Sequence, residues 1–308
     1  MIGTITLNPS VDRRYHIEAL EKNTVNRTDD YEASAGGKGI NVARVLKMLG
    51  EEVAAFGFTG GETGFFIESE LEKLSIKNRM SSIEGTTRTC LNIIDKNGDN
   101  IEVLETGPTI SKEASEEFIK AFQKEIEDYS VFTMSGSLPK GLKEDIYADL
   151  IELAHKKGKK VILDTSGDRI LKNLKAKPYL IKPNEEELAD ITGIALDSEE
   201  AIREAAQVLL DKGAQNVAIS LGSDGMYFFG EEGSYKLTIP KIEVKNTVGS
   251  GDSSVAGFAY GLGNGLNIKE CLKYANACGM SNAGQAGTGV INPEEVKEFI
   301  KEIKVEEI

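Results

Sequence analysis

The chain has 308 residues, of which 40% are hydrophobic and 28% are charged, so it can bury one large core. A net charge of −14 argues against a nucleic-acid partner, because phosphate backbones are bound by basic surfaces. No apolar run approaches the roughly 18 residues of a membrane span, and the cysteines show neither metal-ligand nor disulfide spacing. We therefore expect a cytoplasmic protein with no membrane partner, in which Cys271 and Cys278 are buried core thiols.

Strands and helices alternate along most of the chain. In chain order, the predicted elements are a strand at 1–7, a helix at 41–49, a strand at 53–58, a helix at 65–74, a solvated helix at 113–127, a strand at 131–134, a helix at 144–156, a strand at 160–164, a helix at 169–174, a strand at 179–181, helices at 185–191 and 198–210, a strand at 216–221 and a second solvated helix at 294–307. This alternation predicts a parallel sheet that is covered by helices on both faces.

Two stretches, residues 11–33 and 86–106, are rich in strand-forming residues and have no helix between their strands. The second contains Asn97-Gly98, a typical hairpin turn. Both fit a small β-sheet outside the main layer, which we interpret as a lid. No repeat or linker divides the chain, so we expect residues 1–308 to form a single domain with this lid.

A glycine-rich turn, Gly249-Ser250-Gly251, lies between an extended segment at 239–244 and an apolar helix. Glycines let the backbone turn tightly and expose its N–H groups, and a helix N-terminus adds free amides and a positive dipole end. The turn is therefore suited to a phosphate group. Asp252 would repel that phosphate, so we expect it to act as a general base on a hydroxyl that attacks a phosphoryl group. The alternative is that Asp252 only caps the helix.

Two other phosphate-binding motifs do not fit this turn. The dinucleotide motif needs a third glycine where the chain has Ser254, and it belongs to the first strand–helix unit of a fold. The P-loop pattern G-x-x-x-x-G-K-[ST] does not occur. The residues therefore indicate a small-molecule phosphotransferase of another type.

A second glycine-rich turn, at residues 35–39, also runs into a helix. Its simplest interpretation is a tight turn with Asn41 in the first helical turn. The functional interpretation is that the backbone closely approaches a polyhydroxy ligand, with Asn41 bonding hydroxyls and Lys38 meeting an anion. Two such turns would let one hold the phosphoryl acceptor and the other the donor.

These blocks resemble the two signatures of the ribokinase-like (PfkB) carbohydrate kinases. Further blocks in the same order also resemble the family, and they are found at 6–12, 135–139, 182–187 and 220–225. The resemblance covers essentially the whole chain and implies a three-layer α/β/α fold with a mostly parallel central sheet. The opening Thr-Leu-Asn-Pro-Ser-Val-Asp is similar to the branch that acts on phosphorylated ketohexoses.

The resemblance implies a sugar site near the lid. Asp12, Gly36, Gly37 and Asn41 would contact sugar hydroxyls, with Lys38 beside them. Arg27 and Arg88 would bind the phosphate that the substrate already carries, since the planar guanidinium binds phosphate through two hydrogen bonds. Ser137 would face the same phosphate. Taken singly, Arg27 and Arg88 could also be ordinary exposed strand residues.

The resemblance also implies a site for ATP and Mg²⁺. Asn184 and Glu187 would organise Mg²⁺ through its waters, as this ion keeps much of its hydration shell; Asn184 could equally cap a helix. The residues implied to contact the nucleotide are Lys182, Asn184, Ser220, Gly222, Gly225, Thr247, Gly249, Gly251 and Asn276. The amides of Gly249, Ser250 and Gly251 would stabilise charge on the transferred group.

The sequence leaves the substrate and the class of protein open, and it makes one prediction about assembly. Residues 87–90 and 103–108 are closer to the tagatose-6-phosphate kinases of the branch, while the rest fits the 1-phosphofructokinases equally well. A non-catalytic sugar or nucleotide sensor is a different class of protein, but it would be expected to lose Asp252 or the Gly249–Gly251 turn. An apolar face on the lid strands predicts a homodimer assembled through the lid.

Overall fold

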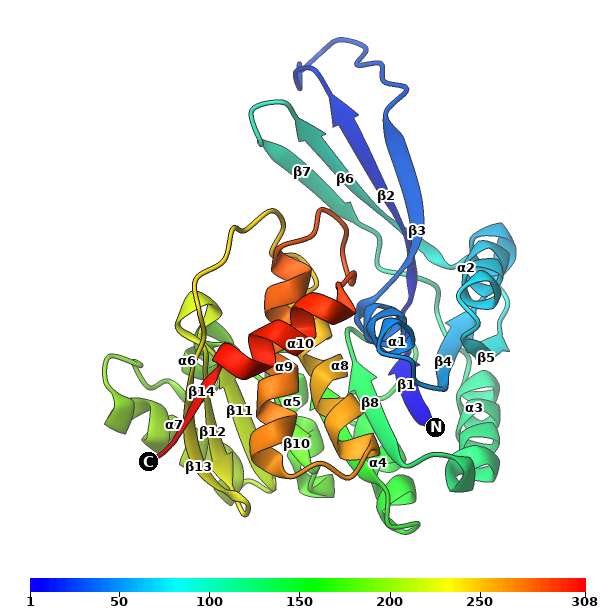
Figure 1. Cartoon of the computed structure of the whole chain (residues 1–308). Coiled ribbons are helices and arrows are strands. Elements are labelled where there is room, and N and C mark those ends of the chain that lie inside the picture. Colours follow the sequence, from blue (N-terminus) through cyan, green and yellow to red (C-terminus); the bar gives the residue numbers. More distant parts are fainter.

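A ten-stranded sheet forms the centre of the molecule in the computed structural model, which describes residues 1–308 (Figure 1). The strand order is β14-β13-β12-β11-β10-β9-β8-β1-β4-β5. Their bounds are β1 (Ile2–Thr6), β4 (Val53–Thr59), β5 (Lys77–Ser82), β8 (Val131–Ser135), β9 (Lys160–Asp164), β10 (Leu180–Ile181), β11 (Asn216–Ser220), β12 (Met226–Gly230), β13 (Gly233–Thr238) and β14 (Lys304–Glu307). Neighbouring strands from β11 to β5 pair in parallel, and β12, β13 and β14 add an antiparallel edge.

Helices cover both faces of this sheet and bury two separate apolar clusters against it. On one face lie α1 (Lys38–Met48), α2 (Gly61–Lys73), α8 (Ser250–Gly263), α9 (Ile268–Ala283) and α10 (Pro293–Glu302). On the other lie α3 (Lys112–Glu125), α4 (Ile146–His155), α5 (Asp168–Asn173), α6 (Glu185–Thr192) and α7 (Glu199–Asp211). The predicted three-layer architecture is therefore confirmed, and Cys271 and Cys278 are buried in the first cluster as expected.

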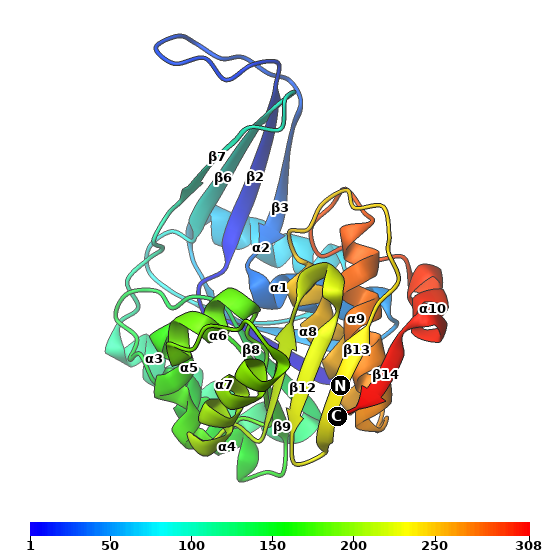
Figure 2. The same cartoon turned by 90° about the vertical axis from the view of Figure 1, so that its left-hand side faces the viewer.

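The small sheet stands apart from these layers, as Figure 2 shows. It has four strands in the order β3-β2-β6-β7, with bounds β2 (Ser10–Ile17), β3 (Tyr31–Gly36), β6 (Arg88–Asp95) and β7 (Asn100–Leu104). The central pair β2–β6 is parallel and the two outer pairs are antiparallel. The β-rich stretches of the sequence thus form one mixed sheet.

The predicted helix at 294–307 is wrong over its last part. Helix α10 ends at Glu302, Ile303 is extended, and Lys304–Glu307 form strand β14. This strand pairs with β13, and Val305 lies opposite Leu237. The pairing satisfies backbone groups that β13 would otherwise leave open at the sheet edge and lets Val305 pack on the core, which outweighs the local helical pattern.

Candidate active site

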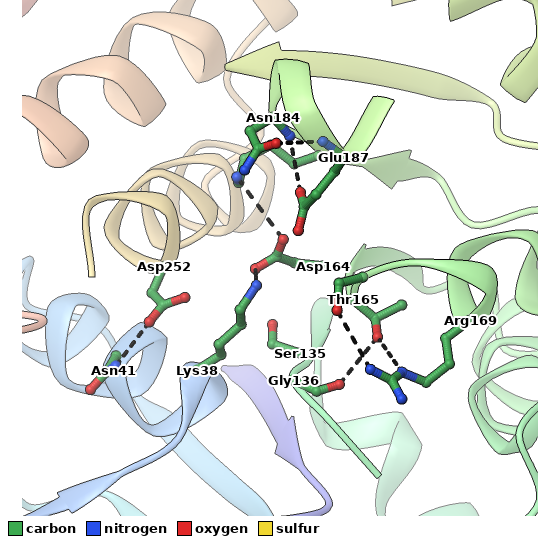
Figure 3. Close-up of polar contacts among 12 residues, drawn as sticks. Lys38, Asn41, Ser135, Gly136, Asp164, Thr165, Arg169, Asn184, Glu187 and Asp252 are labelled. Carbon is green, nitrogen blue, oxygen red and sulfur yellow. Dashed lines mark hydrogen bonds and ion pairs between the residues drawn. The ribbon is translucent and has the colours of Figure 1, made fainter. Parts of the chain in front are cut away.

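Asp252 lies in the first turn of α8, beside the first turn of α1 with Lys38 and Asn41 (Figure 3). Its side chain is buried, and Oδ2 accepts a 2.8 Å hydrogen bond from Asn41 Nδ2. The N-cap of α8 is Gly249, and no side chain caps the helix. The alternative that Asp252 merely caps α8 is therefore wrong.

The surroundings of Asp252 suit it to accept a proton near neutral pH. Burial, aided by the nearby Asp164 carboxylate, raises the pKa of Asp252 to about 6. Lys38, the Asn41 hydrogen bond and Lys182 act in the opposite direction. At pH 7 the carboxylate is then mostly ionised, yet its pKa is close enough to the working pH for efficient general base catalysis.

Two lysines converge on Asp164, which ends strand β9. Lys38 Nζ lies 3.4 Å from Asp164 Oδ2, and the buried Lys182 Nζ lies 4.0 Å from Asp164 Oδ1. The Asp164 carboxylate raises the pKa of Lys38. Both amino groups lie close enough to Asp252 to act on its carboxylate, at a place where an anionic phosphoryl group could be neutralised.

The glycine turn before α8 has the backbone geometry that an anion needs. Gly249 has φ +84°, a left-handed conformation that favours glycine. The N–H groups of Gly249 and Gly251 donate to no protein acceptor, whereas Ser250 N–H donates to Thr247 O at 3.1 Å. The turn therefore leaves the amides of Gly249 and Gly251 for a ligand, but not the amide of Ser250.

A large cleft opens beside this turn, with a volume of about 940 Å³. Its lining includes all but one of the residues that the family resemblance assigned to the nucleotide. The exception is Gly249, which packs against Thr288 and Gly289. The other residues of this set are Lys182, Asn184, Ser220, Gly222, Gly225, Thr247, Gly251 and Asn276. Lys38 and Ser250 also line the cleft, so it reaches the Asp252 site.

Asn184 and Glu187 form a capping box at the start of α6. Asn184 Oδ1 accepts from Glu187 N at 2.7 Å, and Glu187 Oε2 accepts from Asn184 N at 3.0 Å. No group of three or more His, Cys, Asp or Glu side chains is arranged to hold a metal ion. The carboxylate of Glu187 and the amide oxygen of Asn184 line the cleft and nevertheless fit Mg²⁺, which takes oxygen ligands and keeps waters and substrate phosphates as its other ligands.

The residues that were predicted to bind the sugar meet at the root of the small sheet. Ser10 Oγ donates to Asp12 Oδ1 at 2.6 Å, and burial raises the pKa of Asp12. A Cβ at Gly36 would clash with the Asp12 carboxylate, which explains a glycine there. Gly37, with φ +105°, begins α1 as its N-cap. Asp12, Gly36, Gly37 and Asn41 are thus brought together as expected.

Arg88 and Ser137 meet through Asn8, a residue that had no predicted role of its own. Arg88 Nε donates to Asn8 O at 3.2 Å, and Asn8 Nδ2 donates to Ser137 Oγ at 3.2 Å. Arg27 does not join them. It is exposed in the loop between β2 and β3, at the end of the small sheet that points away from the body of the molecule (Figure 1).

Four polar residues of the site were missed or left without a role: Asn8, Arg44, Asp164 and Asn282. Asn282 Oδ1 accepts from Gly289 N at 2.8 Å, and its Nδ2 donates to Val248 O at 3.0 Å. It therefore holds the glycine turn against residues 285–290. Asp164 is the last residue of an apolar strand, and parallel strands present their carboxyl ends to one site, so this position could have been suspected.

A family model described as pfkB family carbohydrate kinase matches residues 5–295. The chain belongs to the pfkB family of carbohydrate kinases. A curated relative, tagatose-6-phosphate kinase of Staphylococcus epidermidis, is 43% identical over 311 residues and covers 100% of both chains.

Solved structures agree with this membership. A putative phosphofructokinase from Staphylococcus aureus superposes with a TM-score of 0.88 at 31% identity, covering 100% of this chain and 99% of the other. A possible 1-phosphofructokinase from Thermotoga maritima gives 0.89 at 27% identity, with 100% and 99% covered. The fold is thus ribokinase-like, and this kinase transfers a phosphoryl group to an alcohol. None of its helices has the length and apolar character needed to span a bilayer.

Proposed function

We propose that this kinase uses ATP to phosphorylate D-tagatose 6-phosphate, giving tagatose 1,6-bisphosphate. The full-length 43% identity to a tagatose-6-phosphate kinase carries the choice of substrate. The geometry agrees with an acceptor that already bears a phosphate, because Arg88 lies beside Ser137 and Asn8 at the rim of the sugar site.

The reaction would be a direct in-line transfer. Asp252 takes the proton of the sugar C1 hydroxyl as that oxygen attacks the γ-phosphoryl group of ATP. The amides of Gly249 and Gly251 stabilise the charge on the transferred group, since they have no other acceptor. Lys38 and Lys182 offset the remaining negative charge, so catalysis is mostly positioning and electrostatics.

Mg²⁺ bound with ATP would be held through waters by Asn184 and Glu187, and it would neutralise charge on the phosphates. The capping box uses one lone pair of Asn184 Oδ1 and one carboxylate oxygen of Glu187. The second lone pair of Asn184 Oδ1 and the oxygen Oε1 of Glu187 could therefore accept hydrogen bonds from the waters of the ion. Asp12 and Asn41 would bind the sugar hydroxyls. The small sheet would close over the sugar as a lid and exclude water, which limits wasteful hydrolysis of ATP.

Arg27 could bind the substrate phosphate only in an assembly, because within one chain it lies away from the site. A homodimer through the small sheet would place one chain's β2–β3 loop near the other chain. We therefore connect the proposed role of Arg27 with the proposed dimer.

An ADP-release assay tests the substrate. The acceptors are tagatose 6-phosphate, fructose 1-phosphate, fructose 6-phosphate and tagatose 1-phosphate, each at several concentrations with ATP and Mg²⁺. We expect the highest kcat/KM for tagatose 6-phosphate. Preference for fructose 1-phosphate would instead favour a 1-phosphofructokinase, the activity named for the Thermotoga maritima neighbour. No ADP with any acceptor would favour a non-catalytic sensor, which the presence of Asp252 and the free turn amides argues against.

A further inference from the structure

Arg44 lies on α1, three residues after Asn41, and its guanidinium donates to three different parts of the molecule. Arg44 Nη1 donates to Asn41 Oδ1 at 3.1 Å and to Thr288 O at 3.0 Å, while Nη2 donates to Ala35 O at 2.6 Å. It therefore joins α1 to strand β3 at the root of the small sheet and to the loop after α9.

This arginine is partly buried among carboxylates rather than solvated. Burial lowers its pKa, and Asp12 of β2, Glu70 of α2 and Asp252 of α8 act against this effect. A guanidinium stays protonated in proteins, so Arg44 is a permanent cation between the sugar-binding Asp12 and the catalytic Asp252. It makes no ion pair within 4 Å, so its hydrogen bonds go to neutral oxygens.

The contact with Asn41 fixes which way that amide points. A guanidinium has donors only, so the Asn41 atom that faces it must be the oxygen. The Asn41 Nδ2 group is then turned the other way, and it donates to Asp252 Oδ2 at 2.8 Å (Figure 3). Without Arg44, the Asn41 side chain could rotate and present its oxygen to Asp252. An ionised carboxylate has no donor, so it could not form a hydrogen bond with that oxygen.

We infer that Arg44 is a positioning residue, which holds the Asn41 amide so that it donates to the catalytic carboxylate of Asp252. The inference rests on the proposed role of Asp252 as the base. Arg44 touches neither the reacting atoms nor the cleft, and acts through Asn41. Its bonds to Ala35 and Thr288 set the position of the guanidinium itself.

The charged groups that face Asp252 define what losing this hydrogen bond should do. Asp164 of β9 disfavours the ionised form, while Lys38 of α1, Lys182 before α6 and the Asn41 amide favour it. The charge of Arg44 also favours it, because the guanidinium and Asp252 interact. Without the hydrogen bond from the Asn41 amide, fewer groups oppose burial and Asp164, so the pKa of Asp252 rises further. The base then ionises at higher pH, and activity at low pH is lost first.

The test is Arg44→Met, which keeps the length of the side chain and removes all its donors. We expect kcat at pH 6.5 to fall about tenfold or more, the scale of one hydrogen bond to a charged group, and the acid limb of the kcat profile to move to higher pH. KM for ATP should change little. Arg203→Met, which removes an exposed guanidinium over the Phe229 ring, is the matched control and should leave the profile unchanged.

A double-mutant cycle separates this role from a merely structural one. If Arg44 acts through Asn41, Arg44→Met should cost little further kcat in an Asn41→Ala background. Equal losses of kcat in both backgrounds, or an unmoved acid limb, would overturn the inference. If Arg44→Met does not fold, Arg44→Lys keeps the charge but not the planar fork. We expect it to shift the acid limb in the same direction, and a wild-type profile would contradict us.

Failure of the inference is distinguishable from failure of the proposed function. If Asp252→Asn is inactive and Arg44→Met has a wild-type profile, only the role of Arg44 is wrong. If Asp252→Asn is fully active, the assignment of the base is wrong, and the role of Arg44 falls with it.

Discussion

Asp252 is buried, and a buried carboxylate that the fold does not need for capping should cost stability when it is ionised. Its pKa in the folded protein, about 6, is above the unfolded value of 3.8. The contribution of Asp252 to folding stability is therefore complete at a pH below its pKa in the unfolded chain. It is lost as the pH rises through its pKa in the folded protein. The ionised carboxylate that we propose as the base is thus a destabilising group at neutral pH.

Asp252→Asn should consequently separate activity from stability. We expect kcat to fall about 10²–10⁴-fold because the base is gone. At pH 8 the thermal midpoint should be equal to or above that of the wild type, and at pH 4 the difference should shrink. Steady-state kinetics and thermal melts at both pH values check this. An active variant would contradict the assignment of the base, and a variant that is unfolded at pH 8 would contradict the expected stability.

Arg88 should discriminate phosphorylated from free sugars. Its guanidinium is held by Asn8 O and Glu105 O, so it is already oriented before substrate arrives. Arg88→Ala should raise KM for the sugar phosphate strongly while KM for ATP changes little, because a charge-assisted contact to a non-reacting phosphate is removed. Arg13→Ala on the same sheet is the control, since Arg13 is exposed and makes no ion pair.

Arg27→Ala provides a second comparison. If Arg27 binds the same phosphate from a partner chain, its loss should raise the same KM. Unchanged preference for the phosphorylated sugar in both the Arg88 and Arg27 variants would remove the proposed phosphate site.

At the scale of elements, the glycine turn before α8 depends on a close contact with the loop after α9. A Cβ at Gly249 would lie 2.8 Å from Gly289 N and 2.9 Å from Thr288 Cγ2. Gly249→Ala therefore has to move the turn away from the loop that Asn282 holds. We expect kcat to fall with a rise in KM for ATP.

Gly265→Ala is the matched control for this change. Gly265 also has a left-handed φ, +68°, but no atom lies within 4 Å of a Cβ there. Both variants should lose about 1 kcal/mol of stability from backbone strain, measured by chemical denaturation. Only Gly249→Ala should lose activity, and equal activities would show that the turn is not required.

The elements that the sequence predicted are those with local signals. Turn chemistry predicted the glycine turns at 35–39 and 249–251. Hydrophobic periodicity predicted the strands and helices at 53–74 and 131–164. Strand β14 could not be foreseen, because its pairing with β13 depends on a contact across the sequence. Asn8 and Asn282 were missed for the same reason, because their contacts are with Ser137 and Gly289 and not with immediate neighbours in the chain. The strand pattern could have pointed to Asp164, but its two lysine partners lie far away in the sequence.

At the scale of the whole molecule, the small sheet has two different faces. Register places Asp12 beside Cys90 on the face of the sugar site, and places Tyr15, Tyr31, Ile93 and Ile101 in one row on the opposite face. Tyr31 and Ile101 are 63% and 42% exposed, which is unusual for apolar residues in a row. An apolar face of this kind favours association with a second copy of the chain.

We therefore predict a homodimer through the small sheet. Sedimentation velocity at micromolar concentration should give twice the chain mass of 33.4 kDa. Tyr31→Asp combined with Ile101→Asp should shift the protein toward monomer, because charges would be buried in the interface. A wild-type monomer at these concentrations would show that the face is not used for dimerisation.

Transfer of phosphate to tagatose 6-phosphate by the intact wild-type kinase is the central claim, and the product itself tests it most directly. The enzyme is incubated with ATP, Mg²⁺ and D-tagatose 6-phosphate, and the mixture is followed by ³¹P NMR. We expect a second phosphomonoester signal, assigned to C1, that grows in step with ADP while the C6 phosphate signal is retained. ADP without a new sugar phosphate, or no reaction at all with the enzyme folded, would contradict it.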